Sequence, residues 1–252
     1  MERIKMIIMY DGTDFAGYQV QINQRTVQQV IERALRKMHK QDVRIFSSGR
    51  TDSGVHAMGQ VIHFDSHLEL DEPTWKHALM TLLPSDIRII EVEKVSQDFH
   101  ARKDASHKTY LYQIRNAKEH EVFARNFEWH IPRALDVDRM QEAAPLMEGT
   151  HDFTAFAASK TNVKGDKTRT IHEVKVLKEG SHIFIEVTGD GFLTHMVRIM
   201  VGTLVEIGIR KKDPKCISEA LSTNERHKLG LTAPGHGLYL KKVAYEKGKT
   251  EH

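Results

Sequence analysis

The amino-acid sequence predicts an α+β protein made of two split-βαβ (ferredoxin-like) halves, each with a mainly antiparallel sheet. The first hundred of its 252 residues alternate between strand-like and helix-like apolar spacing in the order β-α-β-β-α-β. The remaining residues follow a looser order of strands, helix, strands, helix and strand, with no low-complexity linker before them. We therefore expect an N-terminal half at 1–104 and a C-terminal half at 105–247. These halves would flank a shared basic cleft, and residues 248–252 would form a tail.

The elements of the first half each have a local signal. Apolar runs and alternation predict strands at residues 3–10, 43–48, 60–65 and 86–95. Thr26 is expected to cap a helix over 26–40, because its hydroxyl can accept a hydrogen bond from a free backbone N–H of the first turn. Pro73 opens a second helix that reaches about residue 83, since proline suits the first turn of a helix.

The second half is predicted by the same criteria. Strands are expected at residues 108–116, 127–131, 170–178, 182–188 and 237–245, and helices at 136–147, 194–209 and 214–221. Helix 194–209 is apolar almost all round and is therefore expected to be buried. Residues 158–168 are rich in Lys, Thr, Gly and Asp, which is typical of a mobile basic loop.

Composition limits the class of protein. Hydrophobic residues make up 40% of the chain and charged residues 28%, which suits a soluble protein with a real core. No apolar stretch resembles a membrane span. The single cysteine, Cys216, excludes an internal disulfide and is expected to be an ordinary reduced thiol, so we expect the protein in the cytoplasm.

Charge is distributed unevenly along the chain. The net charge is only +3, and residues 1–104 hold 14 Lys and Arg against 15 Asp and Glu, while the remainder holds 23 against 19. The cations gather in three patches: Arg102, Lys103, Lys108 and Arg115; Lys160, Lys164, Lys167 and Arg169; Arg210, Lys211, Lys212 and Lys215. Such patches suit a polyanion bound along a defined track, although an ordinary solvated surface fits the charge pattern equally well.

The strongest functional signal is the run Gly-Arg-Thr-Asp-Ser-Gly-Val-His-Ala at residues 49–57. It connects two predicted strands, and it is longer than a hairpin requires. A single Asp in a loop is more often structural than catalytic. Here, however, Asp52 shares one glycine-bounded turn with Arg50, Thr51 and His56, and this density of chemically active side chains favours a catalytic carboxylate.

This run resembles the catalytic loop of the bacterial tRNA pseudouridine synthase I (TruA) family, whose signature is G-R-T-D-x-G-V-H-A. Four other segments resemble motifs of that family, in the family's order: 10–21 (YDGTDFAGYQVQ), 108–112 (KTYLY), 191–198 (GFLTHMVR) and 233–240 (APGHGLYL). Together the five matches extend from about residue 7 to residue 241. Two details depart from the family pattern: the spacer after Gly191 is one residue shorter, and the segment after Pro234 lacks the usual second proline.

The resemblance implies an isomerase that converts uridine to pseudouridine at positions 38–40 of the tRNA anticodon stem-loop. It implies no metal, nucleotide or redox cofactor. It also implies a homodimer that binds tRNA in a basic cleft across both subunits. Asp52 is then the catalytic nucleophile. Which uridines and which tRNAs are modified stays open, as does whether Asp52 attacks C1′, attacks C6 or first removes a C2′ proton.

Three further residues are candidates for substrate binding. Arg198 lies in the helix expected to be buried, where a guanidinium needs a partner, and we expect it to pair with Asp52 unless its stem reaches solvent. Tyr110 shares one strand face with Tyr112, an arrangement more often found in cores. The resemblance nevertheless assigns Tyr110 to stacking on the target uracil. It also implies that Arg50 fills the space that the extruded nucleotide leaves in the RNA. The alternative is that Arg50 is an ordinary surface arginine.

Two other classes of function fit parts of the sequence less well. A non-catalytic RNA-binding protein can be built from split-βαβ halves, but the aromatic strand signature of that module is absent. A hydrolase that releases the base would need a second well-placed acid, and none is apparent. None of the sixteen histidines has the spacing of a zinc site, so we expect them to be unliganded, with His56 shaping the catalytic loop.

Overall fold

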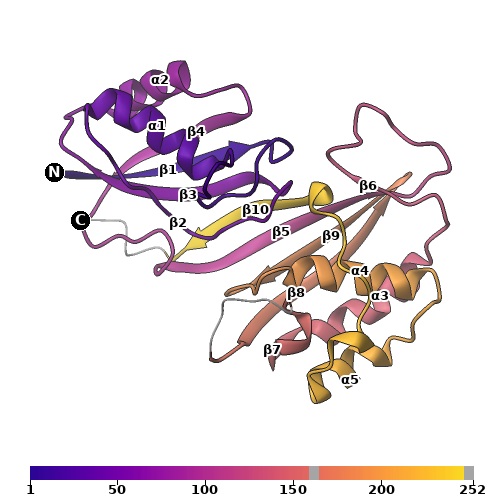
Figure 1. The fold of residues 1–252 in the computed structure, drawn as a ribbon. Helices are drawn as coiled ribbons and strands as arrows, with labels where there is room; N and C mark the ends of the chain where they lie inside the picture. The colour runs from indigo at the N-terminus through magenta and orange to yellow at the C-terminus, as the bar shows by residue number, and fades with distance from the viewer. Residues whose placement is uncertain (159–164, 247–252) are drawn as a thin grey trace. The chain divides into compact units, whose positions relative to one another are not determined.

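The computed structural model describes residues 1–158 and 165–246 (Figure 1). Within these residues the protein has five α-helices and ten strands, and the strand pairings are mostly antiparallel, with parallel pairs at β10–β3 and β5–β6. The predicted α+β class is confirmed. The chain divides into two units, Met1–Ser106 with Tyr239–His252 (unit 1) and His107–Leu238 (unit 2). No helix of the described part is long and apolar enough to cross a membrane.

Unit 1 is a sheet with two helices over one face (Figure 1). Its strands are β1 (Glu2–Tyr10), β2 (Phe46–Ser47), β3 (His56–Ser66), β4 (Ile87–Val95) and most of β10 (Leu238–Tyr245). β1 lies between β4 and β3, β2 pairs with β3 antiparallel, and β10 runs parallel to β3. Helices α1 (Val27–His39) and α2 (Glu72–Leu82) supply the other half of the core, where the Phe64 ring contacts Trp75 and His39.

The helix signals read from the sequence of unit 1 are present in the structure. The Thr26 hydroxyl accepts a hydrogen bond from the Gln29 N–H at 3.4 Å, and Lys40 ends α1 in the left-handed conformation. Pro73 lies in the first turn of α2. The strand predicted at 43–48 is shorter in the structure, Phe46–Ser47. The strand predicted at 60–65 is longer, since β3 begins at His56, where its pairing with β1 reaches the end of the 49–57 loop.

The final strand belongs to unit 1, whereas the sequence placed it in a C-terminal half. Tyr239 and Leu240 pair with His56 and Ala57 of β3, and the Tyr239 ring stacks on the His56 ring at 4.8 Å between centroids. The reason is a pairing between residues more than 180 positions apart, which no local apolar pattern encodes.

Unit 2 contains mainly antiparallel strands of the ten-stranded sheet, together with three helices (Figure 1). Its strands follow the order β5-β9-β8-β7, with β6 parallel to β5: β5 (Ala105–Arg115), β6 (Trp129–His130), β7 (Gly149–Asp152), β8 (Thr168–Glu179) and β9 (His182–Gly189). The helices are α3 (Val137–Ala143), α4 (Met196–Gly208) and α5 (Lys215–Thr223). Strand β7 was not predicted, and most of the loop expected at 158–168 lies outside the described residues.

The helix predicted at 136–147 is divided in two. It is α3 followed by a 3₁₀ turn, Ala144–Met147. Pro145 has no backbone N–H and crowds the preceding turn, so the α-helical hydrogen bonding ends before it.

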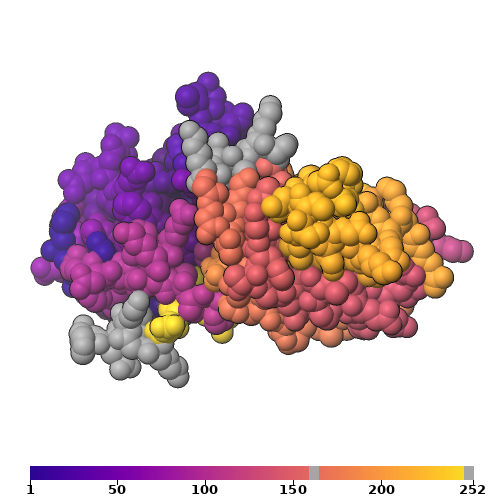
Figure 2. All heavy atoms as spheres, turned by 90° about the horizontal axis from the view of Figure 1, so that it is seen from below, coloured from indigo at the N-terminus to yellow at the C-terminus, as the bar shows by residue number. Residues whose placement is uncertain are grey.

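Helix α4 is the buried centre of unit 2, as its sequence predicts. Of its thirteen residues, only Arg198 is not buried. A Cβ on Gly202 would lie 1.9 Å from the carbonyl oxygen of Leu231, so this glycine lets the backbone of the closing segment pack directly on the helix. In Figure 2 the yellow and light-orange atoms of the chain after α4 form a patch on the face of unit 2 that this view shows.

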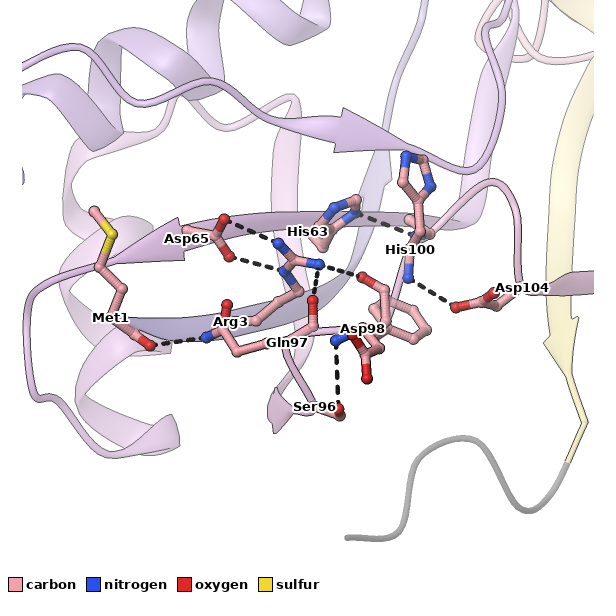
Figure 3. A network of polar contacts seen from close by, with 11 residues as sticks. Met1, Arg3, His63, Asp65, Ser96, Gln97, Asp98, His100 and Asp104 are labelled. Carbon is pink, nitrogen blue, oxygen red and sulfur yellow. Dashed lines mark hydrogen bonds and ion pairs between the residues drawn. The ribbon is translucent and has the colours of Figure 1, made fainter.

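The face of the unit 1 sheet opposite the helices carries a polar network (Figure 3). Arg3 forms two hydrogen bonds with the Asp65 carboxylate, at 2.8 and 2.9 Å, and also donates to the carbonyls of Gln97 and Phe99. His63 Nδ1 accepts from the backbone N–H of Ala101 at 3.2 Å. Together these bonds attach the segment after β4 to the sheet.

Acidification is expected to destabilise this network through His63. Burial, with a further contribution from His100, lowers the pKa of His63 from 6.5 to about 4. Above about pH 6.5 the ring is neutral in both states. As the pH falls toward 4, the unfolded chain binds the proton first, so the free energy of unfolding should drop by about 2–3 kcal/mol.

The matched variant is His63→Gln, which keeps an acceptor for the Ala101 N–H but does not titrate. Denaturant unfolding of both proteins at pH 7 and pH 4.5 measures the difference. An equal loss of stability in wild type and variant would contradict the prediction.

Candidate active site

The loop that carries Asp52 is packed against residues 10–18 of the same unit. The Tyr18 N–H donates to the Thr51 carbonyl at 3.1 Å, and the hydroxyls of Tyr10 and Thr51 share a buried hydrogen bond of 2.8 Å. The Gly54 N–H donates to the Phe15 carbonyl at 3.4 Å. Two of the five motifs, some thirty residues apart in sequence, therefore form one structure.

His56 fastens the far end of this loop. Its Nδ1 accepts a hydrogen bond from the Gly12 N–H at 2.9 Å and lies 3.2 Å from Asp11 Oδ1. The ring is buried, with one face stacked on Tyr239. These contacts support the expectation that His56 shapes the loop.

Gly12 permits this close approach, so its replacement is expected to move the catalytic loop. A Cβ at position 12 would lie 2.1 Å from the Val55 carbonyl oxygen, which is backbone and cannot rotate away. Gly12→Ala should therefore cost about 1–3 kcal/mol of stability and lower kcat at least about tenfold, because displacements near 1 Å are costly in catalysis.

The control is Gly180→Ala, in the turn between β8 and β9. Its φ is +59° and the added Cβ would meet no atom within 4 Å, so it costs stability without touching the loop. Thermal unfolding and steady-state turnover separate the two effects. If Gly12→Ala lost no more activity than Gly180→Ala, the loop assignment would be wrong.

Arg50 and Asp52 lie between two fixed points of the loop. On the strand side, Gln60 Nε2 donates to the Gly49 carbonyl at 3.0 Å. On the other side, the Val55 N–H donates to the Asp52 carbonyl at 3.2 Å, and Gly54 takes a φ of +73° that favours glycine. Asp52 is half-buried and Arg50 is exposed. The loop thus presents a carboxylate and a guanidinium from a fixed backbone.

Tyr110 and Tyr112 share one face of β5 but have different surroundings. Tyr112 is fully buried, and its hydroxyl donates to the Pro234 carbonyl at 2.8 Å. Burial raises the pKa of Tyr112 well above its usual range. The ring of Tyr110, which is 8% exposed, meets the ring of Phe192 edge to face at 5.0 Å. Tyr112 is therefore a core residue, and Tyr110 is the one nearer the surface.

Arg198 is attached to the closing segment. Its Nε donates to the Ala233 carbonyl at 2.7 Å, and the Ala233 N–H donates back to the Arg198 carbonyl at 3.0 Å. Gly237 packs against the ring of Tyr112 so closely that a Cβ would come within 2.7 Å of it. The motifs at 108–112 and 191–198 are thus assembled within unit 2 together with residues 233–238 of the closing motif.

Asp52 belongs to unit 1, whereas Arg198 and Tyr110 belong to unit 2. The pairing of Asp52 with Arg198 therefore stays a prediction. Sequence reasoning missed the hydroxyl contact of Tyr10 with Thr51, although Tyr10 is the first residue of the opening motif and ends β1. Across residues 1–158 and 165–246, no three His, Cys, Asp or Glu side chains are grouped to hold a metal ion.

Comparison with known proteins identifies the class to which this fold and site belong. Residues 6–104 and 143–246 match the family model described as tRNA pseudouridine synthase. These ranges include the loop of Asp52 and the helix of Arg198, while the strand of Tyr110 falls between them. The chain belongs to the tRNA pseudouridine synthase family.

Relatives match along the whole chain. A "tRNA pseudouridine synthase A" of Oceanobacillus iheyensis is 50% identical over 98% of this chain and 98% of its own length. A "tRNA pseudouridine synthase A 1" of Bacillus cereus is 50% identical over 97% of this chain and 99% of its own length. A "tRNA pseudouridine synthase A" of Halalkalibacterium halodurans is 46% identical over 100% of this chain and 96% of its own length. The activity of the chain is accordingly that of a pseudouridine synthase, an isomerase of tRNA.

A solved structure titled "Crystal Structure of a Cbf5-Nop10-Gar1 Complex" is also similar, at 12% identity and a TM-score of 0.32. It covers 81% of this chain and 54% of that one. At this low score it carries no weight for the fold or the function.

Proposed function

We propose that the chain isomerises uridine to pseudouridine at positions 38–40 of the tRNA anticodon stem-loop, with Asp52 as the nucleophile. The observation that carries the proposal is the Asp52 loop itself. Hydrogen bonds from residues 10–18 and from Gln60 hold its backbone, while the Asp52 side chain is half-buried. A carboxylate so positioned loses little conformational freedom when it meets a substrate.

The chemistry requires one carboxylate and no second acid. The C1′–N1 bond breaks, the uracil turns and a C1′–C5 bond forms. The proton on C5 leaves to solvent and N1 takes up a proton, so the product is an isomer of the substrate. Because the detached base is also the group that re-attaches, no water has to be activated and no leaving group has to depart. Whether Asp52 bonds to C1′, bonds to C6 or removes the C2′ proton stays open in this scheme.

Three other residues would bind the substrate. Extruding a stacked nucleotide costs a few kcal/mol, and Arg50, exposed on the loop, is suited to fill the vacated space and bind phosphates. Tyr110 would stack on the target uracil, and its edge contact with Phe192 would hold the ring in place. Arg198 would pair with Asp52 and orient its carboxylate.

The partner would be tRNA, bound by a cytoplasmic homodimer in a basic cleft flanked by two split-βαβ halves. The element order of unit 1, β-α-β-β-α-β, supports the arrangement of the first half. The excess of cations after residue 104 supports a polyanionic ligand.

The test is tritium release from tRNA labelled at C5 of its uridines. Isomerisation releases tritium and leaves the chain intact, base hydrolysis leaves abasic sites, and binding alone gives neither. Substrates with uridine only at position 38, 39 or 40 should each be tested beside a tRNA with uridines elsewhere. Release from the last substrate alone would refute the proposed positions.

A further inference from the structure

Phe46 is an exposed aromatic residue next to the catalytic loop. It lies on β2, six residues before Asp52, and its side chain is 44% exposed. The ring stacks on His63 at 5.2 Å between centroids with an interplanar angle of 21°, and the His100 ring lies at 5.8 Å. These contacts fix the ring while leaving part of it open to solvent, which is unfavourable for a large apolar side chain that binds nothing.

One cation contacts this ring, and two others lie in the turn that follows His100. The guanidinium of Arg44 lies over the ring at 5.8 Å, and Arg44, Arg102 and Lys103 are all exposed. The backbone N–H groups of Arg102 and Lys103 donate to His100 Nδ1 at 3.1 and 3.4 Å, so the His100 ring fixes the turn that carries both cations.

The nearby carboxylates do not cancel these charges by pairing with them. Asp65 is engaged by Arg3, and Asp104 Oδ2 accepts a hydrogen bond from the His100 N–H at 2.8 Å (Figure 3). Within residues 1–158 and 165–246, neither Arg44 nor Arg102 forms an ion pair. The three cations Arg44, Arg102 and Lys103 outnumber the neighbouring Asp98 and Asp104, so the surface around Phe46 keeps a positive charge that suits an anionic ligand.

We propose that Arg44, Phe46, His100, Arg102 and Lys103 form a second RNA-contact surface, here called the Phe46 surface. A base of the tRNA other than the target stacks on Phe46, and the cations bind the flanking phosphates. The proposal rests on the proposed function insofar as the ligand is tRNA. Base stacking on an aromatic ring combined with phosphate neutralisation is the general chemistry of single-stranded RNA binding.

Two variants test the stacking and the charge separately. Phe46→Ala should raise the Kd for unmodified tRNA roughly 5- to 100-fold, and Phe46→Tyr should restore it. The double variant Arg44→Gln/Arg102→Gln should weaken binding and also reduce the slope of log K against log salt by about 1–2. Phe46→Ala should leave this slope unchanged.

Lys37→Gln is the charge control, since Lys37 is exposed on α1, on the helix-covered face of unit 1. Unfolding midpoints close to wild type show that the variants fold. Wild-type Kd and salt slope in both Phe46→Ala and the double variant would overturn the proposal. The proposal would also be overturned if these variants lost self-association but kept the wild-type affinity for tRNA. The Phe46 surface would then be a protein–protein interface. The binding measurement does not depend on turnover. If the wild-type protein released no tritium, the proposed function would be refuted, but the Kd measurements would still test the Phe46 surface.

Discussion

Replacement of Asp52 by asparagine is expected to lower tritium release from C5-labelled tRNA by at least about 10⁴-fold, because removing a nucleophile removes the covalent step itself. The amide has nearly the shape of the carboxylate, and the loop is held by backbone hydrogen bonds on both sides of position 52. The Kd for tRNA should therefore stay within about threefold of wild type, since most binding energy comes from phosphate contacts elsewhere.

Asp52→Ala should behave in the same way, and Asp14→Asn serves as the control. Asp14 is exposed in the same unit and should retain full turnover after the change. Single-turnover measurements with excess protein exclude product release as the step affected. Full activity in either Asp52 variant would refute its role as nucleophile.

Replacement of Arg198 is expected to have the next largest effect. If Arg198 pairs with the half-buried Asp52, its removal leaves that carboxylate without its partner, at about 1–3 kcal/mol. Arg198→Met should thus lower kcat by up to about 10²-fold. Arg198→Lys keeps the charge but not the planar fork, so it should recover only part of this loss. Because Arg198 Nε also donates to the Ala233 carbonyl, unfolding must be measured beside activity.

A double-mutant cycle on stability tests the pairing directly. Asp52→Asn and Arg198→Met should couple by about 1–3 kcal/mol in the free energy of unfolding if the two side chains are in contact. The control is the exposed ion pair of Arg210 with Asp136, at 2.8 Å, which should couple by less than about 1 kcal/mol. Additive effects of the Asp52 and Arg198 changes would show that the pair does not form.

Residues close in sequence made several helix boundaries in both units, and the burial of one helix, predictable. Thr26 and Pro73 mark the starts of α1 and α2, since caps act within one helical turn. The nearly continuous apolar sequence of α4 predicts a buried helix, and the structure buries every residue of it except Arg198. The end of α-helical hydrogen bonding before Pro145, within the helix predicted at 136–147, is also a local effect. It follows from the missing backbone N–H of the proline itself.

The candidate site was predictable only as separate pieces. The unusual composition of residues 49–57 identifies Asp52 and Arg50, and alternation on β5 identifies the shared face of Tyr110 and Tyr112. The sequence could not show which of these tyrosines is the core residue. That depends on the Pro234 carbonyl, more than 120 residues away, which accepts a hydrogen bond from the Tyr112 hydroxyl.

The sequence by itself determined where the helices of unit 1 begin, which helix is buried and which loop carries the catalytic candidates, because these depend on neighbours within a few residues. Tertiary structure alone decided that the last strand joins β3 in parallel, that Tyr10 and Gly12 hold the Asp52 loop, and that Phe46 stays exposed beside His63. Such contacts join residues dozens to hundreds of positions apart. Their geometry follows from the packing of the whole unit and produces no periodic pattern of apolar residues in the sequence.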